Sequence, residues 1–295
     1  MGFNTFELNL FRHDLKKSNR LFIAFVGDNH DDVDGHVSDH LTALKSFDKR
    51  YKPHEVLFHL MGDYGDFCST SERAIIKNSK LHDTTIRTLD DVAATRLKKR
   101  IKQFEFMKGR VIGVHNGNHD WHFTTGEYEG RYASEVLAES LQAKHIGYVA
   151  YSVVQMKNII GDNCSMKMDI VSCHGKGGGK RIGAGFNTIE DMSYIFEGAD
   201  IYAQGHNHQL GGIPSARLTV DLCAKTGKLV YREKVISFIR TGSAMQGYKP
   251  GDRTYVSDSL MKPCALGFPI SVIEFSRKRA KDGSRHIVKS QKTLA

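Results

Sequence analysis

The sequence predicts an α/β fold with much parallel strand pairing, and three observations indicate it. Short apolar runs alternate with helical patterns along the first two thirds of the chain. These runs are dense in Val, Ile, Leu and Phe, which is typical of strands covered on both faces. After residue 208 the pattern changes to strand-like segments separated by glycine-containing turns, so a second, more antiparallel sheet is expected.

Short apolar runs mark the predicted strands. In the first two thirds of the chain they cover residues 21–26, 56–61, 111–114, 169–173 and 201–203. Runs this short suit buried strands better than helices, which need more residues to form a stable stripe. Beyond residue 208 the strand-like segments cover residues 217–222, 229–239 and 269–275.

Four helices are expected between the strands. They cover residues 38–51, 89–106, 134–146 and 188–196. The first places Leu41, Leu44 and Phe47 on one side of a helix, and the second places Leu97 and Ile101 on an apolar stripe. Strands that alternate with helices predict layers of helix against a sheet.

Length and composition suit one globular domain. The chain has 295 residues, of which 40% are hydrophobic and 25% charged, values that exclude a coiled coil or a disordered chain. We expect a single domain over residues 1–276, of which residues 1–19 are an N-terminal extension, followed by a basic C-terminal tail over residues 277–295. The net charge of +9 favours a phosphate-bearing partner, and a nucleic acid bound through the basic surface is one candidate.

Cysteine usage and hydropathy bear on the compartment. The five cysteines are scattered and contain no C-x-x-C pair, which predicts reduced thiols in a cytoplasmic protein. No secretory signal is recognised, and no apolar run approaches the roughly 20 residues that a membrane span needs. No membrane association is therefore expected, and the oligomeric state is left open.

Each of the five predicted strands in the first part ends in residues that can bind a metal ion. In chain order, these ends are Gly27-Asp28-Asn29-His30, Gly62-Asp63-Tyr64-Gly65-Asp66, Gly117-Asn118-His119-Asp120, His174-Gly175 and Gly205-His206-Asn207-His208. Ligands of open α/β sheets gather outside the carboxyl ends of the strands, so the five ends are expected to converge on one site.

The residue types fit a site for two divalent ions. Mn, Fe and Zn accept mixed carboxylate, imidazole and carbonyl ligands, which the five ends supply as two Asp, one Asn and four His. Two ions about 3.5–4 Å apart need a bridging carboxylate, and they activate water and clamp the oxygens of a phosphate under attack. Asp63 is the natural bridge.

These motifs, in this order, resemble the calcineurin-like metallophosphoesterase superfamily. Its signature is D-x-H, G-D-x-x-D, G-N-H-[DE], a His beside Gly, and G-H-x-H, and all five parts occur between Asp28 and His208. One departure is Phe67, which stands where that family often has Arg after G-D-x-x-D. The resemblance implies Asp28, His30, Asp63 and His208 as ligands of one metal, and Asp63, Asn118, His174 and His206 as ligands of the other.

The resemblance also implies a fold and an activity. The fold would be a four-layer α/β/β/α sandwich with two mixed β-sheets. His119 would face the leaving-group oxygen, and Asp120 would orient its ring. The expected activity is hydrolysis of phosphate esters by a metal-bridging hydroxide, with two divalent ions, Mn first and Fe, Zn or Ni as alternatives.

Several interpretations stay open from the sequence. Phosphodiesters, including DNA or RNA in a nuclease reaction, are the expected substrates, and a phosphatase or phosphodiesterase for small nucleotides or phosphoproteins is the alternative. A non-catalytic metal-binding scaffold is a third. Lys176, Lys180 and Arg181 follow the fourth motif in a Gly-rich stretch, and are either contacts for the substrate phosphate or part of a flexible turn. His59, inside an apolar run, is interpreted as a hydrogen-bonded core histidine.

Overall fold

Two mixed β-sheets form the centre of the protein. The structure is a computed structural model that describes residues 6–30, 39–67, 82–175, 182–222, 226–248, 250–251, 255–258, 263, 265–279 and 285–294. The five-stranded sheet contains, in order across it, β11 (Arg285–Leu294), β10 (Ile270–Arg279), β2 (Arg20–Val26), β3 (Val56–Leu60) and β4 (Val111–Val114). The six-stranded sheet contains β1 (Phe6–Asp14), β5 (Val149–Ile159), β6 (Asp162–Cys173), β7 (Ile201–Gln204), β9 (Leu229–Thr241) and β8 (Leu210–Leu222).

Each sheet combines parallel and antiparallel pairs. In the five-stranded sheet β2, β3 and β4 run parallel, whereas β10 is antiparallel to both β2 and β11. In the six-stranded sheet β6, β7 and β9 run parallel, β1 is parallel to β5, and the pairs β5–β6 and β8–β9 are antiparallel. The carboxyl ends of β2, β3, β4, β6 and β7 therefore lie at the same end of the two sheets.

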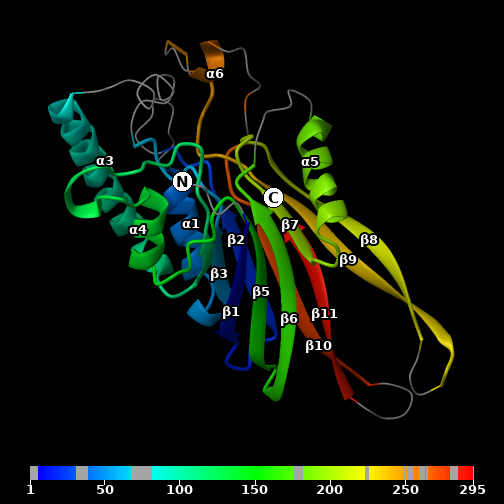
Figure 1. The fold of residues 1–295 in the computed structure, drawn as a ribbon. Helices are drawn as coiled ribbons and strands as arrows, with labels where there is room; N and C mark the ends of the chain where they lie inside the picture. The colour runs from blue at the N-terminus through cyan, green and yellow to red at the C-terminus, as the bar shows by residue number, and fades with distance from the viewer. Residues whose placement is uncertain are drawn as a thin grey trace.

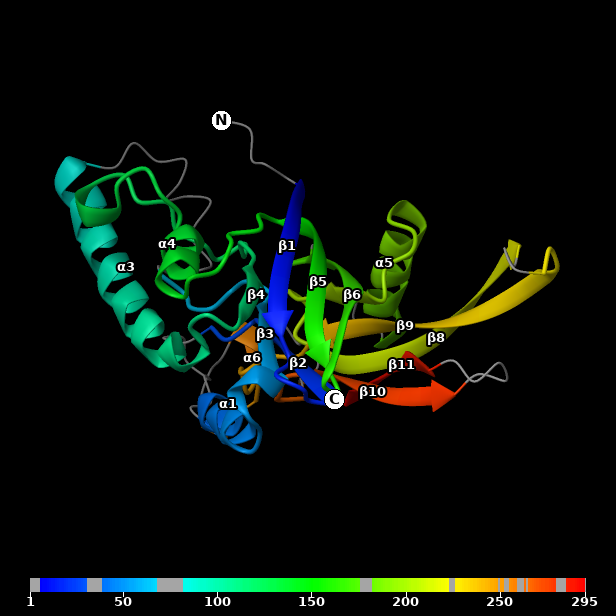
Figure 2. The same cartoon turned by 90° about the horizontal axis from the view of Figure 1, so that it is seen from below.

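Helices cover the outer faces of the sheets (Figure 1). They are α1 (Asp39–Lys49), α3 (Asp83–Phe104), α4 (Ala133–Ser140) and α5 (Ile182–Ile195), whereas the single turn α6 (Tyr255–Asp258) lies beyond one end of the sheets. Short 3₁₀ turns occur at Pro53–Glu55, Glu105–Met107 and Gly126–Tyr128. Helices α1, α3 and α4 lie beside the five-stranded sheet and α5 beside the six-stranded sheet, as the view from below shows (Figure 2).

Three clusters of buried side chains separate the four layers. Leu97 of α3 packs in one cluster with Phe58 of the five-stranded sheet. Phe25 of that sheet and Ile170 of the six-stranded sheet belong to a second cluster between the sheets. Ile189 of α5 belongs to a third cluster on the outer face of the six-stranded sheet. The four-layer α/β/β/α sandwich with two mixed β-sheets is confirmed.

The five strands predicted in the first part are confirmed, but they divide between two sheets. β2, β3 and β4 belong to one sheet, and β6 and β7 to the other. We expected the strands after residue 208 to form a second sheet of their own, but they do not. Instead β9 continues the parallel core of the six-stranded sheet beside β7, and β8 pairs antiparallel to it at the edge. β10 pairs antiparallel to β2 in the five-stranded sheet, and β11 forms the edge beyond it.

Both chain ends differ from the prediction. The N-terminal extension contains β1, which pairs with β5 over its full length, and the expected basic tail from residue 277 continues β10 to Arg279 and then forms β11. The tail prediction is therefore wrong for these residues. β11 was missed because few of its side chains are apolar: Lys289 reaches Asp200 at 3.0 Å, and Gln291 bonds Ser237 at 2.9 Å. Long-range polar partners leave no periodic signal in the sequence.

Candidate metal centre

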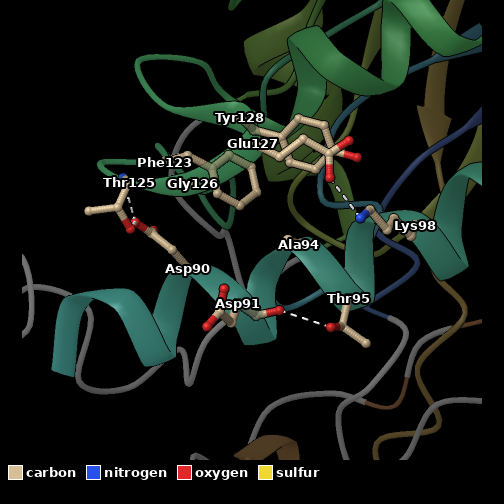
Figure 3. A pocket seen from close by; sticks show the side chains of 10 residues that line it. All are labelled: Asp90, Asp91, Ala94, Thr95, Lys98, Phe123, Thr125, Gly126, Glu127 and Tyr128. Atoms are coloured by element: carbon tan, nitrogen blue, oxygen red, sulfur yellow. Dashed lines mark hydrogen bonds and ion pairs between the residues drawn. The ribbon is translucent and has the colours of Figure 1, made fainter. Parts of the chain in front are cut away.

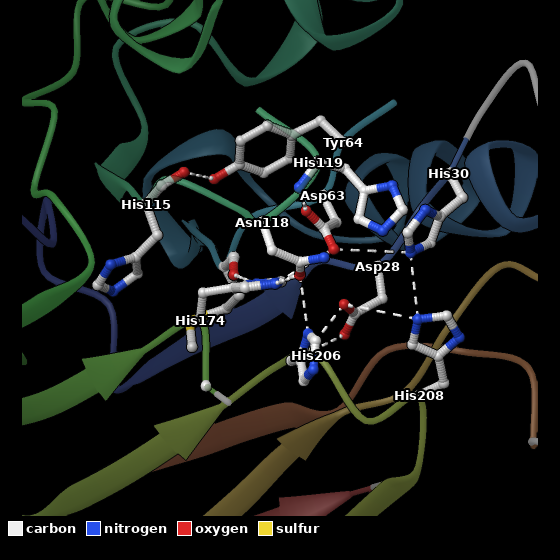
Figure 4. Close-up of polar contacts among 12 residues, drawn as sticks. Asp28, His30, Asp63, Tyr64, His115, Asn118, His119, His174, His206 and His208 are labelled. Carbon is white, nitrogen blue, oxygen red and sulfur yellow. Dashed lines mark hydrogen bonds and ion pairs between the residues drawn. The ribbon is translucent and has the colours of Figure 1, made fainter. Parts of the chain in front are cut away.

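The side chains that follow five strands meet at one end of the sandwich (Figure 4). Asp28 and His30 follow β2, Asp63 follows β3, Asn118 and His119 follow β4, His174 follows β6, and His206 and His208 follow β7. Each sheet contributes ligands, so the site lies where the edges of the two sheets face one another. Neither sheet carries all of them.

The first cluster contains Asp28, His30 and His208, whose ligand atoms all lie within 4.8 Å of one another. The Nε2 atoms of His30 and His208 are 3.1 Å apart, close to the spacing of two nitrogens that each lie about 2.1 Å from one ion. The Asp28 carboxylate is buried and accepts a hydrogen bond from the Thr241 hydroxyl at 2.9 Å. Ser243 Oγ lies 3.4 Å from His208 Nδ1, on the far side of that ring.

The second cluster contains Asp63, His174 and His206, with Asn118 between the two imidazoles. Asn118 Oδ1 lies 2.8 Å from His174 Nε2 and 2.8 Å from His206 Nδ1. His174 Nδ1 donates to the Met61 carbonyl oxygen at 2.8 Å, so the neutral ring presents Nε2 as its ligand atom. A carboxylate, an amide oxygen and two imidazole nitrogens are a ligand set that first-row divalent ions accept.

Asp63 lies between the clusters. Its Oδ2 atom is 3.2 Å from His174 Nε2 and 3.8 Å from His30 Nε2, and its Oδ1 atom accepts the backbone N–H of His119 at 2.8 Å. One carboxylate oxygen therefore faces ligand nitrogens of both clusters while the other is held by the backbone. This is the geometry expected of a bridging carboxylate, and the donor set fits two divalent ions.

Burial and close charges shift the pKa values of these groups in opposite directions. Burial raises the pKa of Asp28, although His208 and His174 oppose the rise. Burial would also raise the pKa of Asp63, but His174 and His30 outweigh it and hold that pKa well below the usual range. Burial would lower the pKa of His174, but Asp63 outweighs it and raises that pKa to about 9. Without a cation, a proton on His174 balances the buried Asp63 charge.

The backbone is strained at the candidate ligands. Positive φ angles, which side chains other than glycine rarely adopt, occur at ten non-glycine residues that the structure describes. Five of these ten are candidate ligands: Asp28 (51°), His30 (43°), Asp63 (49°), His206 (72°) and His208 (54°). Each such conformation costs of the order of 1 kcal/mol or more, and clusters of them are typical of functional sites.

Two glycines let the strand ends approach closely. A Cβ atom at Gly117 would lie 1.9 Å from Asp63 Oδ1 and 2.3 Å from the Asp63 backbone nitrogen. A Cβ atom at Gly62, which has a φ of +101°, would lie 2.5 Å from His174 Nδ1. A side chain at either position would displace a candidate ligand.

The ring of His119 contacts a different carboxylate from the one expected. His119 Nδ1 lies 3.1 Å from Asp66 Oδ1, at the end of the second motif. Asp120 instead accepts hydrogen bonds from Asn116 Nδ2 at 3.0 Å and from the backbone and hydroxyl of Ser134. The prediction that Asp120 orients His119 is therefore wrong. Asp120 instead joins the motif loop to the start of α4. Burial raises the pKa of Asp120 to about 6.

Three residues at the site were not predicted from the sequence, and three predicted substrate contacts lie outside the described residues. Asp66 was part of a motif but had no assigned role, and Thr241 and Ser243 gave no signal because β9 is distant in sequence from the motifs. Lys176, Lys180 and Arg181 lie outside the described residues.

His59 is confirmed as a core histidine. It is fully buried, and its Nε2 atom lies 2.8 Å from Ser172 Oγ. The same hydroxyl lies 2.8 Å from His115 Nε2, so the three side chains form a chain of polar contacts between the two sheets. Because His59 belongs to β3 and Ser172 to β6, these contacts join the two sheets.

A separate depression lies against α3, away from the ligand clusters (Figure 3). Its volume is about 300 Å³, and it lies between α3 and the turn that contains Glu127 and Tyr128. Lys98 pairs with Glu127 at 2.7 Å at its rim. The Asp90 carboxylate accepts hydrogen bonds from Trp121, Thr124 and Thr125, so its contacts anchor that turn. None of the candidate metal ligands lines this depression.

Among the described helices, none is long and apolar enough to cross a membrane. Cys164 and Cys173 both carry free thiols.

Comparisons with known proteins find low similarity to solved structures and no matching family. No family model matches the sequence, and no curated protein matches it. A crystal structure of Vps29 from Chaetomium thermophilum is similar with a TM-score of 0.32 and 7% identity, covering 92% of this chain and 96% of that one. A second crystal structure of the same protein, in complex with a cyclic peptide, has a TM-score of 0.33, 10% identity and coverage of 93% and 96%. Similarity this low carries no argument about function.

Proposed function

We propose that this protein is a phosphoesterase of the calcineurin-like type that uses two divalent metal ions. The observation that carries the proposal is the position of Asp63, whose Oδ2 atom faces ligand nitrogens from both clusters. The proposed ligands are those expected from the sequence: Asp28, His30, Asp63, Asn118, His174, His206 and His208. Mn is the first candidate for both ions, and Fe, Zn or Ni also suits the mixed ligand set.

The ions and the side chains have separate tasks. Two bound ions would supply a water-derived nucleophile and neutralise the charge that develops on the phosphate. His119 is positioned by its backbone bond to Asp63 and by the contact of its ring with Asp66. A carboxylate at Asp66 would accept a hydrogen bond from the proton on Nδ1 and stabilise the doubly protonated ring, whose Nε2 proton could then be donated to the leaving-group oxygen. His119 is therefore the proposed catalytic group, and Asp66 its positioning residue.

The proposed substrates are phosphodiesters, with nucleic acid the first class to test. The support is the net charge of +9, because lysine and arginine contacts with a phosphate backbone release counterions and strengthen binding. Arg277 and Lys278 lie near the far end of β10, which runs antiparallel to β2, so they lie away from the carboxyl ends of β2 and β3 and do not contribute directly to the site. Small nucleotides and phosphoproteins are the alternative substrates. The free thiols support a reducing compartment such as the cytoplasm.

Metal removal and reconstitution test the activity. Protein treated with EDTA is expected to lose hydrolysis of an aryl phosphodiester, and Mn is expected to restore it. Asp63→Asn removes the bridging charge and is expected to lower turnover at least about 1,000-fold. Asp162→Asn is the matched control, because Asp162 is a half-exposed carboxylate paired with Arg277 at the opposite end of the sandwich. Full activity of Asp63→Asn would disprove the proposal.

A substrate panel separates the alternatives. Mn-loaded protein would be assayed with aryl mono- and diesters, cyclic nucleotides, phosphopeptides, and single- and double-stranded DNA and RNA. Cleavage of nucleic acid that weakens steeply with salt supports the nuclease reaction. Cleavage of small nucleotides or phosphopeptides alone supports the alternative. Less than one bound ion per chain after Mn loading, with no hydrolysis in the panel, would support a scaffold instead.

A further inference from the structure

The β8–β9 ribbon carries an apolar face that no described residue covers. Beyond its contacts with β11, the ribbon extends past the rest of the sandwich as two paired strands (Figures 1 and 2). The apolar ribbon face consists of Leu218 (70% exposed), Val220 (67%), Leu222 (67%), Leu229 (75%) and Tyr231 (75%).

The strand register places these five side chains on one face. Val220 pairs with Tyr231, and Leu222 pairs with Leu229, so the side chains of each pair lie next to one another. Leu218, Val220 and Leu222 alternate along β8 and therefore point to the same side. The result is a continuous apolar surface on both strands, rather than single exposed side chains of the kind that most proteins carry.

The apolar ribbon face continues a surface that is buried nearer the metal centre. On the same face, the position of Gly212 is close to Thr293 of β11, and Ser237 bonds Gln291 of β11 at 2.9 Å. The opposite face of the ribbon is held by α5, where Arg217 donates to Ser193 at 2.7 Å. A two-stranded ribbon is only marginally stable in water unless an apolar face packs against another element, so burial of the apolar ribbon face would stabilise the ribbon.

We propose that this face is covered by the apolar ribbon face of a second copy of the chain, in a two-fold symmetric dimer. The five side chains offer about 600 Å² per copy at their exposed fractions, which approaches the roughly 800 Å² per partner of a standard interface. The face is uncharged at its centre, as a surface that meets itself must be. This proposal does not depend on the proposed function, since the ribbon lies far from the ligand clusters.

The charge beside the apolar ribbon face lies at its inner end, where Glu233 pairs with Leu218. Lys228 precedes Leu229, so alternation along the strand places it on the other side of the ribbon. A two-fold axis that passes near the Val220–Tyr231 pair reverses the strand direction of the second copy. The Glu233 side chains of the two copies then lie at opposite ends of the interface and do not face one another.

The oligomeric state of the full chain tests the proposal. Sedimentation equilibrium is expected to show a dimer of the wild-type chain at about 10 µM, a concentration well above the Kd of a typical specific interface. The double variant Val220→Asp, Tyr231→Asp places charges in the interface centre and is expected to raise the dimer Kd at least about 100-fold. Both side chains are exposed, so circular dichroism and the melting temperature should show a folded monomer.

A control variant locates the contact. Leu8→Asp is the matched control: Leu8 is 68% exposed but lies on β1, at the other edge of the six-stranded sheet, so the dimer should persist. A wild-type monomer, a dimer that survives the double variant, or dissociation by Leu8→Asp would each overturn the proposal.

Discussion

The two ends of the sandwich follow different physical rules. At the metal end, the candidate ligands Asp28, His30 and Asp63 are buried, and their backbones have positive φ angles. At the opposite end, the strands turn in hairpins whose side chains are largely exposed, and Arg277 pairs with Asp162 in solvent. Positive φ angles also occur around the β1–β2 and β5–β6 turns of the opposite end, at Lys16, Lys17, Asn158 and Ile160. The comparison teaches that the strained residues are buried and held by several elements at the metal end, but lie in partly exposed turns at the other end.

Glycine substitutions should give the largest difference between the ends. Gly117→Ala would place a Cβ atom 1.9 Å from Asp63 Oδ1, and the nearby Asp63 backbone cannot move away cheaply. We expect a loss of more than about 3 kcal/mol in the free energy of unfolding, together with loss of Mn binding. Gly227 lies in the β8–β9 turn with a φ of +63° and nothing within 4 Å of an added Cβ. Gly227→Ala should cost only about 1 kcal/mol, measured by urea unfolding, and leave Mn binding intact. Equal losses in the two variants would contradict the comparison.

Within the metal end, Asp66 and Asp120 should respond differently. Asp66→Asn weakens the contact with His119 Nδ1, so kcat on an aryl phosphodiester should fall about 10- to 100-fold with KM little changed. Asp120→Asn should act mainly on stability, by about 2 kcal/mol, because an amide nitrogen would face the donors Asn116, Ser134 and Trp121. Steady-state kinetics and urea unfolding of both variants check this. The reverse pattern would restore Asp120 as the residue that orients His119.

The raised pKa of His174 predicts that the stability of the metal-free protein and its affinity for Mn depend on pH. The opposite end of the sandwich should contribute no such dependence. In the metal-free protein this pKa is raised to about 9, so the charged His174 stabilises the fold fully below about pH 6.5, and that contribution is lost as the pH rises through about 9. Metal binding must displace the same proton, so apparent Mn affinity should rise up to about tenfold per pH unit between about pH 7 and 9. Thermal unfolding of EDTA-treated protein and Mn titrations measure the two trends. His174→Gln should flatten both, and an unchanged pH profile in that variant would rule out this role.

The smallest effect is expected at the exposed ion pair. Arg277 contacts Asp162 through two bonds, at 2.8 and 3.1 Å, but both side chains are nearly half exposed. Surface pairs of this kind contribute about 0–1 kcal/mol. Arg277→Ala should therefore change the free energy of unfolding by less than about 1 kcal/mol and leave phosphodiester hydrolysis unchanged. A large loss of activity would place this end of the molecule in the reaction after all.

Local patterns predicted much of the fold and of the site. β2, β3 and β4 are short apolar runs, and their buried character follows from composition alone. The candidate ligands directly follow these runs, so their placement at the carboxyl ends of strands was also predictable. β1, β5 and β11 were missed because part of each strand is polar or exposed, and their pairing depends on partners distant in sequence.

The sequence by itself determined which residue types stand at the ends of the parallel strands, because a strand and the turn after it are local features. Only the tertiary structure decided how those ends are divided between two sheets. It also decided that Asp66, rather than Asp120, contacts the ring of His119, and that the Thr241 hydroxyl donates a hydrogen bond to Asp28. The physical reason is that sheet pairing and packing join residues far apart in the chain. Such contacts leave no repeating pattern in the amino-acid order, and they become visible only when the layers are assembled.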